Sequence, residues 1–298
     1  MTKGGPSPAL LFFCLIGWQV SPSEIRRACQ ILRKLSASEA HLNQRLNQRR
    51  EPIFNVPRVV LGVLLVLGLI QAVRQYVLPE DIDRVLVWSL AFVPARYDTS
   101  SLTDGLLPGG WGAELWTFFT YALLHADWMH FGFNAIWLLA FASPVARRFG
   151  AGRFLLFSAV TVAAGAFAYL IAHPGALAPM IGASAGISGA MGAAARFAFE
   201  PRGPLDFWQA DRREAHTVPA APLSVALRNP RVLTFVGVWF GLNLLFGIGS
   251  VSLMVGENQS IAWEAHVGGF LAGLLLFGAF DRPPPRASED HDNAELSA

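Results

Sequence analysis

The stretch IGASAGISGAMGAAARFAF, residues 181–199, places two serines and four glycines in an apolar segment long enough to cross a bilayer as a helix. Glycine lowers helix propensity, but inside a bilayer small residues let a neighbouring helix backbone come close. Ser184 lies near the start of this predicted helix, where backbone N–H groups have no partner within the helix. A single intramembrane serine more often serves helix packing, so a chemical role for Ser184 requires a partner elsewhere in the chain.

The rest of the chain has the composition of a multi-pass membrane protein. It has 298 residues, of which 53% are hydrophobic and 15% are charged. Six apolar segments come close to the roughly 20 residues that a helix needs to cross the hydrocarbon core. We therefore predict an all-α membrane protein, a bundle of six transmembrane helices over residues 58–78, 128–146, 154–173, 181–199, 232–254 and 261–280.

The positions of the Lys and Arg residues predict how the helices are oriented. They gather before the first span, between the second and third, between the fourth and fifth, and after the sixth. With six spans these segments share one side, so the positive-inside rule places both termini in the cytoplasm. The long connection 79–127 is then the first outer loop, and its segment 84–96 is too short to cross the bilayer, which favours a place at the interface or over the bundle. We expect three regions: a basic cytoplasmic extension (1–50), a six-helix domain (51–281) and a disordered tail (282–298).

Charge and cysteine content exclude several classes of partner. The net charge is only +2 and the basic residues are spread over short connections, so no nucleic-acid partner is expected. Cys14 and Cys29 lie near the start of the chain without a cluster of His or Cys around them, which argues against a disulfide framework and a metal site. We expect neither a metal nor a cofactor.

The sixth predicted span supplies a partner for the serine. His266 lies near its outer end in AHVGGFLAG, residues 265–273, among small residues that permit tight helix contact. Because the fourth and sixth helices both run from the outside inward, Ser184 and His266 fall at similar depth. A neutral imidazole, with an ordinary pKa of about 6.5, can take the serine proton as its oxygen attacks a carbonyl. Glu264 points nearly opposite to His266 on a helix, so we predict a Ser-His dyad without an acidic third member.

The second span adds polar groups near the same surface, in HADWMHFGFN, residues 125–134. His130 and Asn134 are four positions apart and share a helix face, so they could donate hydrogen bonds to an oxyanion together with the backbone N–H of Ser184. The alternative for these two residues, and equally for His125, is a polar cluster that joins helices or caps a loop. Asn243 in the fifth span is interpreted as a contact between helices.

Taken together, GASAGISG, AHVGGFLAG and HADWMHFGFN resemble the rhomboid intramembrane serine proteases, and the REPIFNVP before the first span is similar to bacterial members of that family. The resemblance covers about residues 51–280. It implies Ser184 as nucleophile, His266 as general base, and His130 and Asn134 at the oxyanion. It also implies a fourth helix that begins partway into the membrane and a fifth helix that acts as a lateral gate. The supporting residues by this resemblance are His125, Phe133 (near the gate), Gly182, Gly186, Gly269 and Gly273.

The resemblance further implies transmembrane proteins as substrates, cut at or just below the outer face, and a multi-pass protein of the bacterial inner (plasma) membrane. The natural substrate and the oligomeric state stay open. Some relatives carry an aromatic residue four positions after the serine that stacks on the histidine. Ser188 stands there in this chain, so another group must orient His266.

Three other functions compete with proteolysis. An inactive rhomboid-like protein that binds transmembrane clients is the main alternative, although inactive relatives usually lose the serine or the histidine. A transporter or channel is suggested by Asn134, Asn243 and the intramembrane histidines, but the chain has no internal repeat and no charge in the middle of a span. A zinc protease is disfavoured because H-E-x-x-H is absent.

Overall fold

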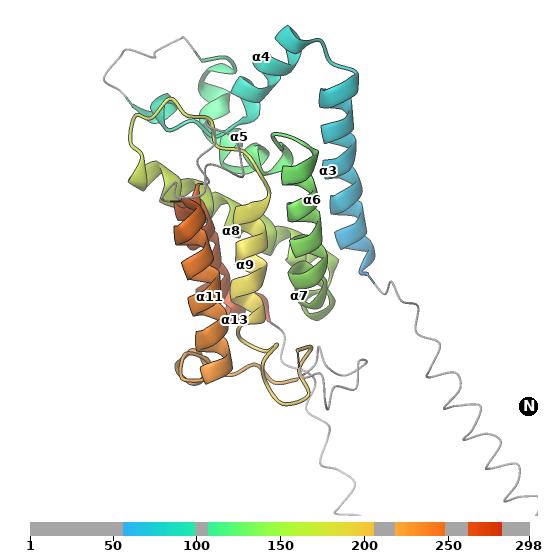
Figure 1. Ribbon diagram of the computed structural model, residues 1–298, viewed down its shortest axis with the longest axis vertical. Coiled ribbons are helices and arrows are strands. Elements are labelled where there is room, and N and C mark those ends of the chain that lie inside the picture. Colours follow the sequence, from blue (N-terminus) through green and yellow to red (C-terminus); the bar gives the residue numbers. More distant parts are fainter. Residues whose placement is uncertain (1–55, 99–106, 206–217, 248–261, 282–298) are drawn as a thin grey trace, which may run out of the picture. The chain divides into compact units, whose positions relative to one another are not determined.

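The computed structural model describes residues 56–98, 107–205, 218–247 and 262–281, where the chain is helical apart from its connections and one isolated antiparallel β-bridge, Phe92 to Met180 (Figure 1). The chain divides into two units, Met1–Asn55 and Val56–Ala298, and all the described residues belong to the second. Its elements are α3 (Arg58–Tyr76), α4 (Glu80–Leu90), η1 (Pro94–Tyr97), α5 (Gly110–Thr120), η2 (Tyr121–Leu123), α6 (Trp128–Trp137), η3 (Leu138–Ala142), α7 (Ser143–Phe149), α8 (Ala151–Ala172), α9 (Ser184–Ala194), α10 (Leu223–Ala226), α11 (Pro230–Gly247) and α13 (Trp263–Phe280). The predicted extension 1–50 and tail 282–298 lie outside the described residues.

The prediction of an all-α membrane bundle is confirmed. Within the described ranges, four helices are long and apolar enough to cross a membrane: α3, the continuous Trp128–Phe149, α8 and α13. α11 adds a shorter apolar stretch, Pro230–Leu245. Because a bilayer offers no partner to backbone N–H and C=O groups, such segments must be helical. Large apolar side chains on their outer faces, such as Leu65 and Ile171, are exposed and suit contact with lipid.

The fourth predicted span, residues 181–199, is wrong as a single spanning helix. α9 begins only at Ser184 and ends at Ala194. At about 1.5 Å per residue it is about 16 Å long, roughly half of the hydrocarbon thickness. Hydropathy overestimates the length of this helix because Gly182 before it has a positive φ of 124° and residues 195–205 form turns. α9 thus begins closer to the middle of the bundle than α6 does (Figure 1).

Small residues bring α9 and α13 into close contact. A Cβ on Gly269 would strike the carbonyl oxygen of Ala185, and one on Gly273 would strike that of Gly189. One on Gly192 would strike the carbonyl of Phe270, so the contact runs along both helices. Since these backbones touch, larger side chains at the glycines would force the helices apart.

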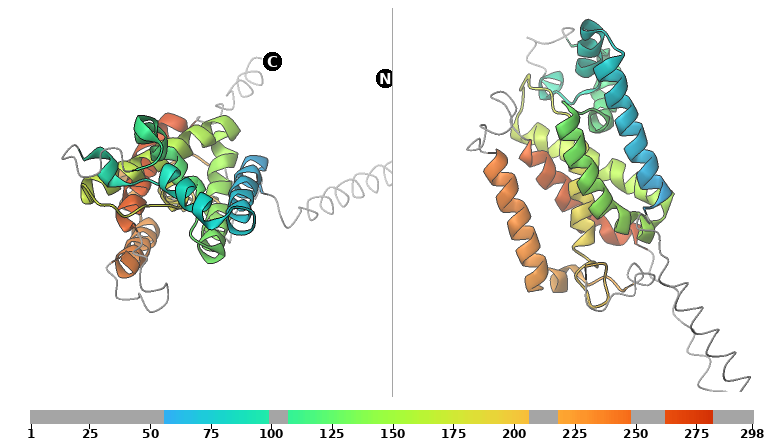
Figure 2. Two further views of the ribbon diagram at one scale, coloured as in Figure 1. Left: turned by 90° about the horizontal axis from the view of Figure 1, so that it is seen from above. Right: turned by 45° about the vertical axis from the view of Figure 1, so that its right-hand side comes forward.

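α3 and α11 lie at opposite edges of the bundle in every view (Figures 1 and 2). We call the end of the bundle that carries α4 and α5 the α4 end, and the end that carries α10 the α10 end. Both α3 and α11 run from the α10 end to the α4 end. α9 and α13 run the other way, from the α4 end to the α10 end. The first residues of α9 and α13 therefore share an end with the last residues of α11.

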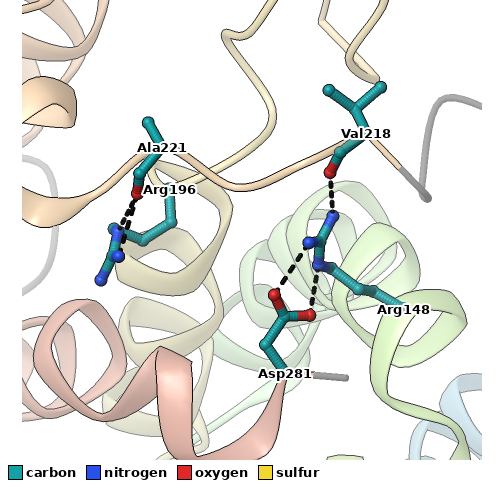
Figure 3. Close-up of polar contacts among 5 residues, drawn as sticks. All are labelled: Arg148, Arg196, Val218, Ala221 and Asp281. Carbon is teal, nitrogen blue, oxygen red and sulfur yellow. Dashed lines mark hydrogen bonds and ion pairs between the residues drawn. The ribbon is translucent and has the colours of Figure 1, made fainter. Parts of the chain in front are cut away.

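At the α10 end, two arginines join segments that are far apart in sequence (Figure 3). Arg148 of α7 forms a two-point ion pair with Asp281, at 2.7 and 2.9 Å, and donates to the carbonyl oxygen of Val218 at 2.6 Å. Arg196 donates twice to the carbonyl of Ala221, at 3.1 and 2.9 Å, and once to that of Leu274. We call these contacts the arginine clasp. It ties the chain that leads into α10 and α11 to the bundle.

At the α4 end, the first long connection packs over the chain that enters α9. Phe92 and Met180 exchange backbone hydrogen bonds of 3.1 and 2.8 Å, and Ala95 donates to the carbonyl of Ala176. Arg96 supports this segment by donating to the carbonyl oxygens of Trp88 and Pro108. The extended residues before Ser184 are therefore held by a second piece of chain.

Candidate active site

Ser184 is the first residue of α9, and the backbone just before it is tightly constrained. Gly182 donates its N–H to the carbonyl oxygen of Tyr121 at 3.0 Å. The Tyr121 side chain is buried and its hydroxyl donates to the carbonyl of Val162 on α8 at 2.8 Å. The φ of 124° at Gly182 is one that residues with a Cβ rarely adopt. These contacts hold the half-buried Ser184 at the beginning of a helix, where backbone N–H groups are free.

The structure brings Ser184 and His266 together. The Oγ of Ser184 lies 2.7 Å from the Nε2 of His266, which is hydrogen-bond distance. His266 stands in the first turn of α13, at the same end of the bundle as the start of α9. The contact between Gly269 and Ala185 fixes the relative height of the two helices just below this pair.

The second ring nitrogen of His266 also has a partner, Asn243 of α11. Nδ1 of His266 lies 2.5 Å from Oδ1 of Asn243. The sequence identified Asn243 only as a contact between helices, because neither its depth nor the direction of its side chain could be matched to His266. The available signal was a polar residue in the middle of the predicted fifth span.

His130 lies beside the same backbone. Its Nε2 is 2.8 Å from where a Cβ on Gly182 would stand, and Oγ of Ser184 is 3.7 Å from that same point. The Nδ1 of His130 accepts from the backbone N–H of Ala126 at 3.4 Å, so in the neutral ring the proton sits on Nε2, the nitrogen that faces Gly182. α6 is fixed here by its N-cap Asp127, which accepts from the backbone N–H of His130. A donor thus lies beside the backbone that leads into Ser184.

Asn134 is buried one turn further along α6. Its Nδ2 donates to the carbonyl oxygen of His130 at 3.1 Å, which uses one of its two amide hydrogens. The second hydrogen stays available to a ligand.

His125 packs behind His130 instead of facing Ser184. The two rings meet edge to face with centroids 5.1 Å apart, and Phe131 contacts the other side of His125. Its carbonyl oxygen accepts from Arg74 at 2.7 Å. Burial, helped by the nearby His130 and Arg74, lowers the pKa of His125 to about 3. His125 is therefore neutral at ordinary pH and acts as packing for the His130 ring.

The remaining predicted residues fall around this centre. Phe133 of α6 is exposed. The α6–α7 helix meets α11 deeper in the bundle, where the ring centroids of Phe141 and Phe235 are 5.6 Å apart. Gly186 faces α8, since a Cβ there would press on Val162. Gly269 and Gly273 face α9 through their contacts with its backbone.

Three chemical functions meet at the start of α9: a hydroxyl, an imidazole positioned to take its proton, and N–H donors beside them. This set suits nucleophilic attack on a carbonyl with stabilisation of the resulting oxyanion. Among the residues that the structure describes, no three His, Cys, Asp or Glu side chains gather closely enough to hold a metal ion.

A comparison with protein families agrees with this arrangement. Residues 112–281, more than half of the chain, match the family model described as the Rhomboid domain. The match includes the site residues on α6, α9, α11 and α13. A search of curated proteins finds no significant match.

Proposed function

The chain belongs to the rhomboid family of membrane serine proteases, and from this premise we propose that it is an active endopeptidase that cleaves transmembrane segments of other membrane proteins. Ser184 is the nucleophile and His266 the general base. The observation that carries the proposal is the 2.7 Å contact between Oγ of Ser184 and Nε2 of His266.

The reaction follows from these atoms. Nε2 takes the hydroxyl proton as Oγ bonds to the carbonyl carbon of the substrate. The carbonyl π electrons move to oxygen, which accepts hydrogen bonds from the backbone N–H of Ser184, the Nε2–H of His130 and the free Nδ2–H of Asn134. One such donor contributes about 2.7–4 kcal/mol to the transition state. The imidazolium then returns the proton to the leaving amine as the C–N bond breaks.

Hydrolysis of the acyl-enzyme repeats the same steps with water. His266 takes a proton from water, the hydroxide oxygen attacks the ester carbon, and the C–Oγ bond breaks as Oγ regains a proton. The half-buried Ser184 at the α4 end supports access for water.

Substrate preference follows from helix energetics. A helical substrate hides its scissile carbonyl in the i to i+4 hydrogen bonds, so segments with Gly, Pro or small residues near the outer interface unwind at lower cost. Replacing these residues by Leu in a cleaved substrate should slow turnover, and unchanged rates would argue against unwinding. The exposed Phe133 and helix α11 are the elements that we assign to lateral access.

The decisive experiment uses the purified protein with a fluorophosphonate probe and a generic transmembrane substrate. Wild type should form an adduct at Ser184 and cleave the substrate, whereas Ser184→Ala and His266→Ala should do neither. Ser188→Ala is the matched control, because it removes the same hydroxyl from a buried position one turn along α9 and should keep activity. A wild type that neither reacts nor cleaves would indicate an inactive rhomboid-like protein that binds clients.

The orientation belongs to the proposal as well: both termini in the cytoplasm of a bacterial inner membrane and the α4 end outside. A cysteine at the exposed Asp81, in a chain with Cys14 and Cys29 replaced, should react with an impermeant maleimide in intact spheroplasts. Labelling only after lysis would invert the topology.

A further inference from the structure

We propose that Asn243 is a positioning residue that holds His266 in the tautomer able to act as a base, an inference that rests on the proposed function. The hydrogen-bonded series is then Ser184–His266–Asn243, with its third member on α11. Two hydrogen bonds, one within α11 and one between α11 and α13, carry this inference.

The orientation of the Asn243 amide is fixed by its own helix. Its Nδ2 donates to the carbonyl oxygen of Trp239, four residues earlier, at 2.8 Å. Turning the amide over would set Oδ1 against that carbonyl, two acceptors without a proton between them. Oδ1 is therefore the atom presented to His266.

The amide orientation in turn fixes the protonation of the imidazole. Oδ1 can only accept, so Nδ1 of His266 must carry the proton of the neutral ring. Nε2 then has a free lone pair, and it is this nitrogen that lies 2.7 Å from Oγ of Ser184. In the other tautomer Nε2 would carry a hydrogen and could not take the serine proton. After proton transfer, Nδ1–H of the imidazolium keeps its acceptor in a site where an unpaired donor is costly.

Contacts on either side hold α11 and α13 in this register. One turn further into the bundle, the rings of Trp239 and Phe270 stack with centroids 4.4 Å apart. One turn toward the α4 end, a Cβ on Gly247 would strike the ring of Trp263. The Asn243–His266 bond thus lies between these two contacts of the antiparallel helices.

Other groups near His266 do not perform this task. Glu264, two residues earlier, has its Oε1 3.1 Å from Nε2 of His173 and is engaged with α8. Ser188 is buried one turn below Ser184 on α9, and its short side chain supplies no ring to stack on the imidazole. Asn243 therefore answers what orients His266 in a chain that lacks an aromatic residue at position 188. A neutral Asn as third member also occurs in Cys-His-Asn proteases, a chemical precedent for the role.

The test compares Asn243→Leu with Asn243→Asp. Leu keeps the volume and removes the acceptor, whereas Asp keeps an acceptor oxygen at the same place. We expect Leu to lower kcat and the rate of fluorophosphonate labelling at Ser184 by about 10- to 100-fold with KM little changed, by analogy with the loss of a group that orients a metal-ligating His. Asp should retain more activity than Leu. If Asn243 only packs helices, Asn243→Leu should be more active than Asn243→Asp, because Leu suits an apolar interface and Asp does not.

Leu275→Ala, which changes an exposed residue nine positions after His266 on α13, serves as control and should keep wild-type rates and substrate affinity. Thermal unfolding of each variant separates loss of fold from loss of rate. If Asn243→Leu is folded and reacts at the wild-type rate, the inference is wrong.

A second readout does not depend on activity. In protein labelled with ¹⁵N-histidine, the signals that disappear in His266→Ala should show a protonated Nδ1 and an unprotonated Nε2 at a pH where the ring is neutral. Asn243→Leu should convert them to a mixture of tautomers. If the wild type is inactive but shows this tautomer, the proposed function is wrong and the role of Asn243 stands. If the wild type is active but His266 carries its proton on Nε2, the role of Asn243 is wrong and the proposed function stands.

Discussion

At the α10 end of the bundle a charged clasp holds the chain, whereas at the α4 end α11 meets α13 through a neutral hydrogen bond, a ring stack and a glycine contact. Arg148 is almost fully buried, with a side chain 3% exposed, and it combines a two-point ion pair with cation–π contact to the Phe197 ring at 4.7 Å. At the other end, the hydrogen bond joins the uncharged amide of Asn243 to the imidazole of His266, and both residues are only half-buried.

The difference separates stability from chemistry. Charge-assisted, bidentate bonds are the stronger ones and resist opening, which suits the fixed start of α10 and α11. Neutral groups at the site can exchange a proton and can be released when a substrate approaches. We therefore expect changes at the site to lower rates with little effect on folding, and changes in the clasp to do the reverse.

Among changes that leave Ser184 and His266 in place, the largest change in rate should come from Gly182→Ala. Its Cβ would press on the His130 ring, at a φ of 124° that alanine rarely adopts, so both the oxyanion donor and the backbone before Ser184 would shift. Activity should fall by about 10²- to 10³-fold, as for loss of an oxyanion donor. Fluorophosphonate labelling measures this. Gly132→Ala, which meets nothing within 4 Å, should label normally.

Disrupting the clasp should lower stability next. Arg148→Gln leaves the Asp281 carboxylate and the Val218 carbonyl without their partner, and we expect a loss of about 2–3 kcal/mol in the free energy of unfolding, below the range for fully buried pairs because Asp281 is 14% exposed. The labelling rate of the protein that remains folded should stay within about threefold of wild type. Arg228→Gln, at an exposed position in the same region, should change neither. A large loss of rate in folded Arg148→Gln would contradict the division between a stabilising end and a reactive one.

His125 should make stability depend on pH at the α4 end. Its pKa is lowered to about 3 in the folded chain, against about 6.5 when unfolded, so the unfolded state binds more protons between these values. The stability contribution is thus complete above about pH 6.5 and falls as pH drops toward 3. At pH 5 the loss is about 2 kcal/mol. His125→Phe should flatten the pH dependence of thermal unfolding by this amount, and an unchanged slope would mean that the ring is not neutral.

The smallest effect should come from Arg74→Gln. Arg74 pairs with Asp83 at 2.7 and 3.1 Å and donates to the carbonyl of His125, but the Asp83 side chain is 26% exposed. Solvent screening limits the expected loss to about 1 kcal/mol of unfolding free energy. Arg84→Gln, at an exposed position on α4, is the matched control and should leave the free energy of unfolding unchanged. A loss as large as that of Arg148→Gln would erase the difference between the two ends.

Much of the site could be predicted from the sequence because spacing on a helix carries geometry. The spans could be ordered from apolar length, and the shared direction of the fourth and sixth placed Ser184 and His266 at similar depth. Their 2.7 Å contact agrees with that prediction. The structure also places His130 beside Gly182. The position of His125 could not be derived from the sequence, because a loop residue has no helical register.

The prediction that failed, the full fourth span, depended on contacts between distant segments. Hydropathy predicted a full fourth span, but the pairing of Phe92 with Met180 and the backbone of Gly182 delay α9 until Ser184. Hydropathy reports how apolar the side chains are, whereas the start of a helix depends on the backbone conformation and hydrogen bonds of the preceding residues.

The amino-acid sequence alone was enough to establish a helical membrane protein with a serine and a histidine in glycine-rich helices, because the bilayer enforces helices and local spacing sets their faces. The bond between Asn243 and His266 and the reach of Arg148 to Asp281 emerged only from the packed bundle. Those contacts depend on how α11 and α13 are rotated and set against each other, and side-chain packing between helices fixes that rotation, which no periodicity within a single helix contains.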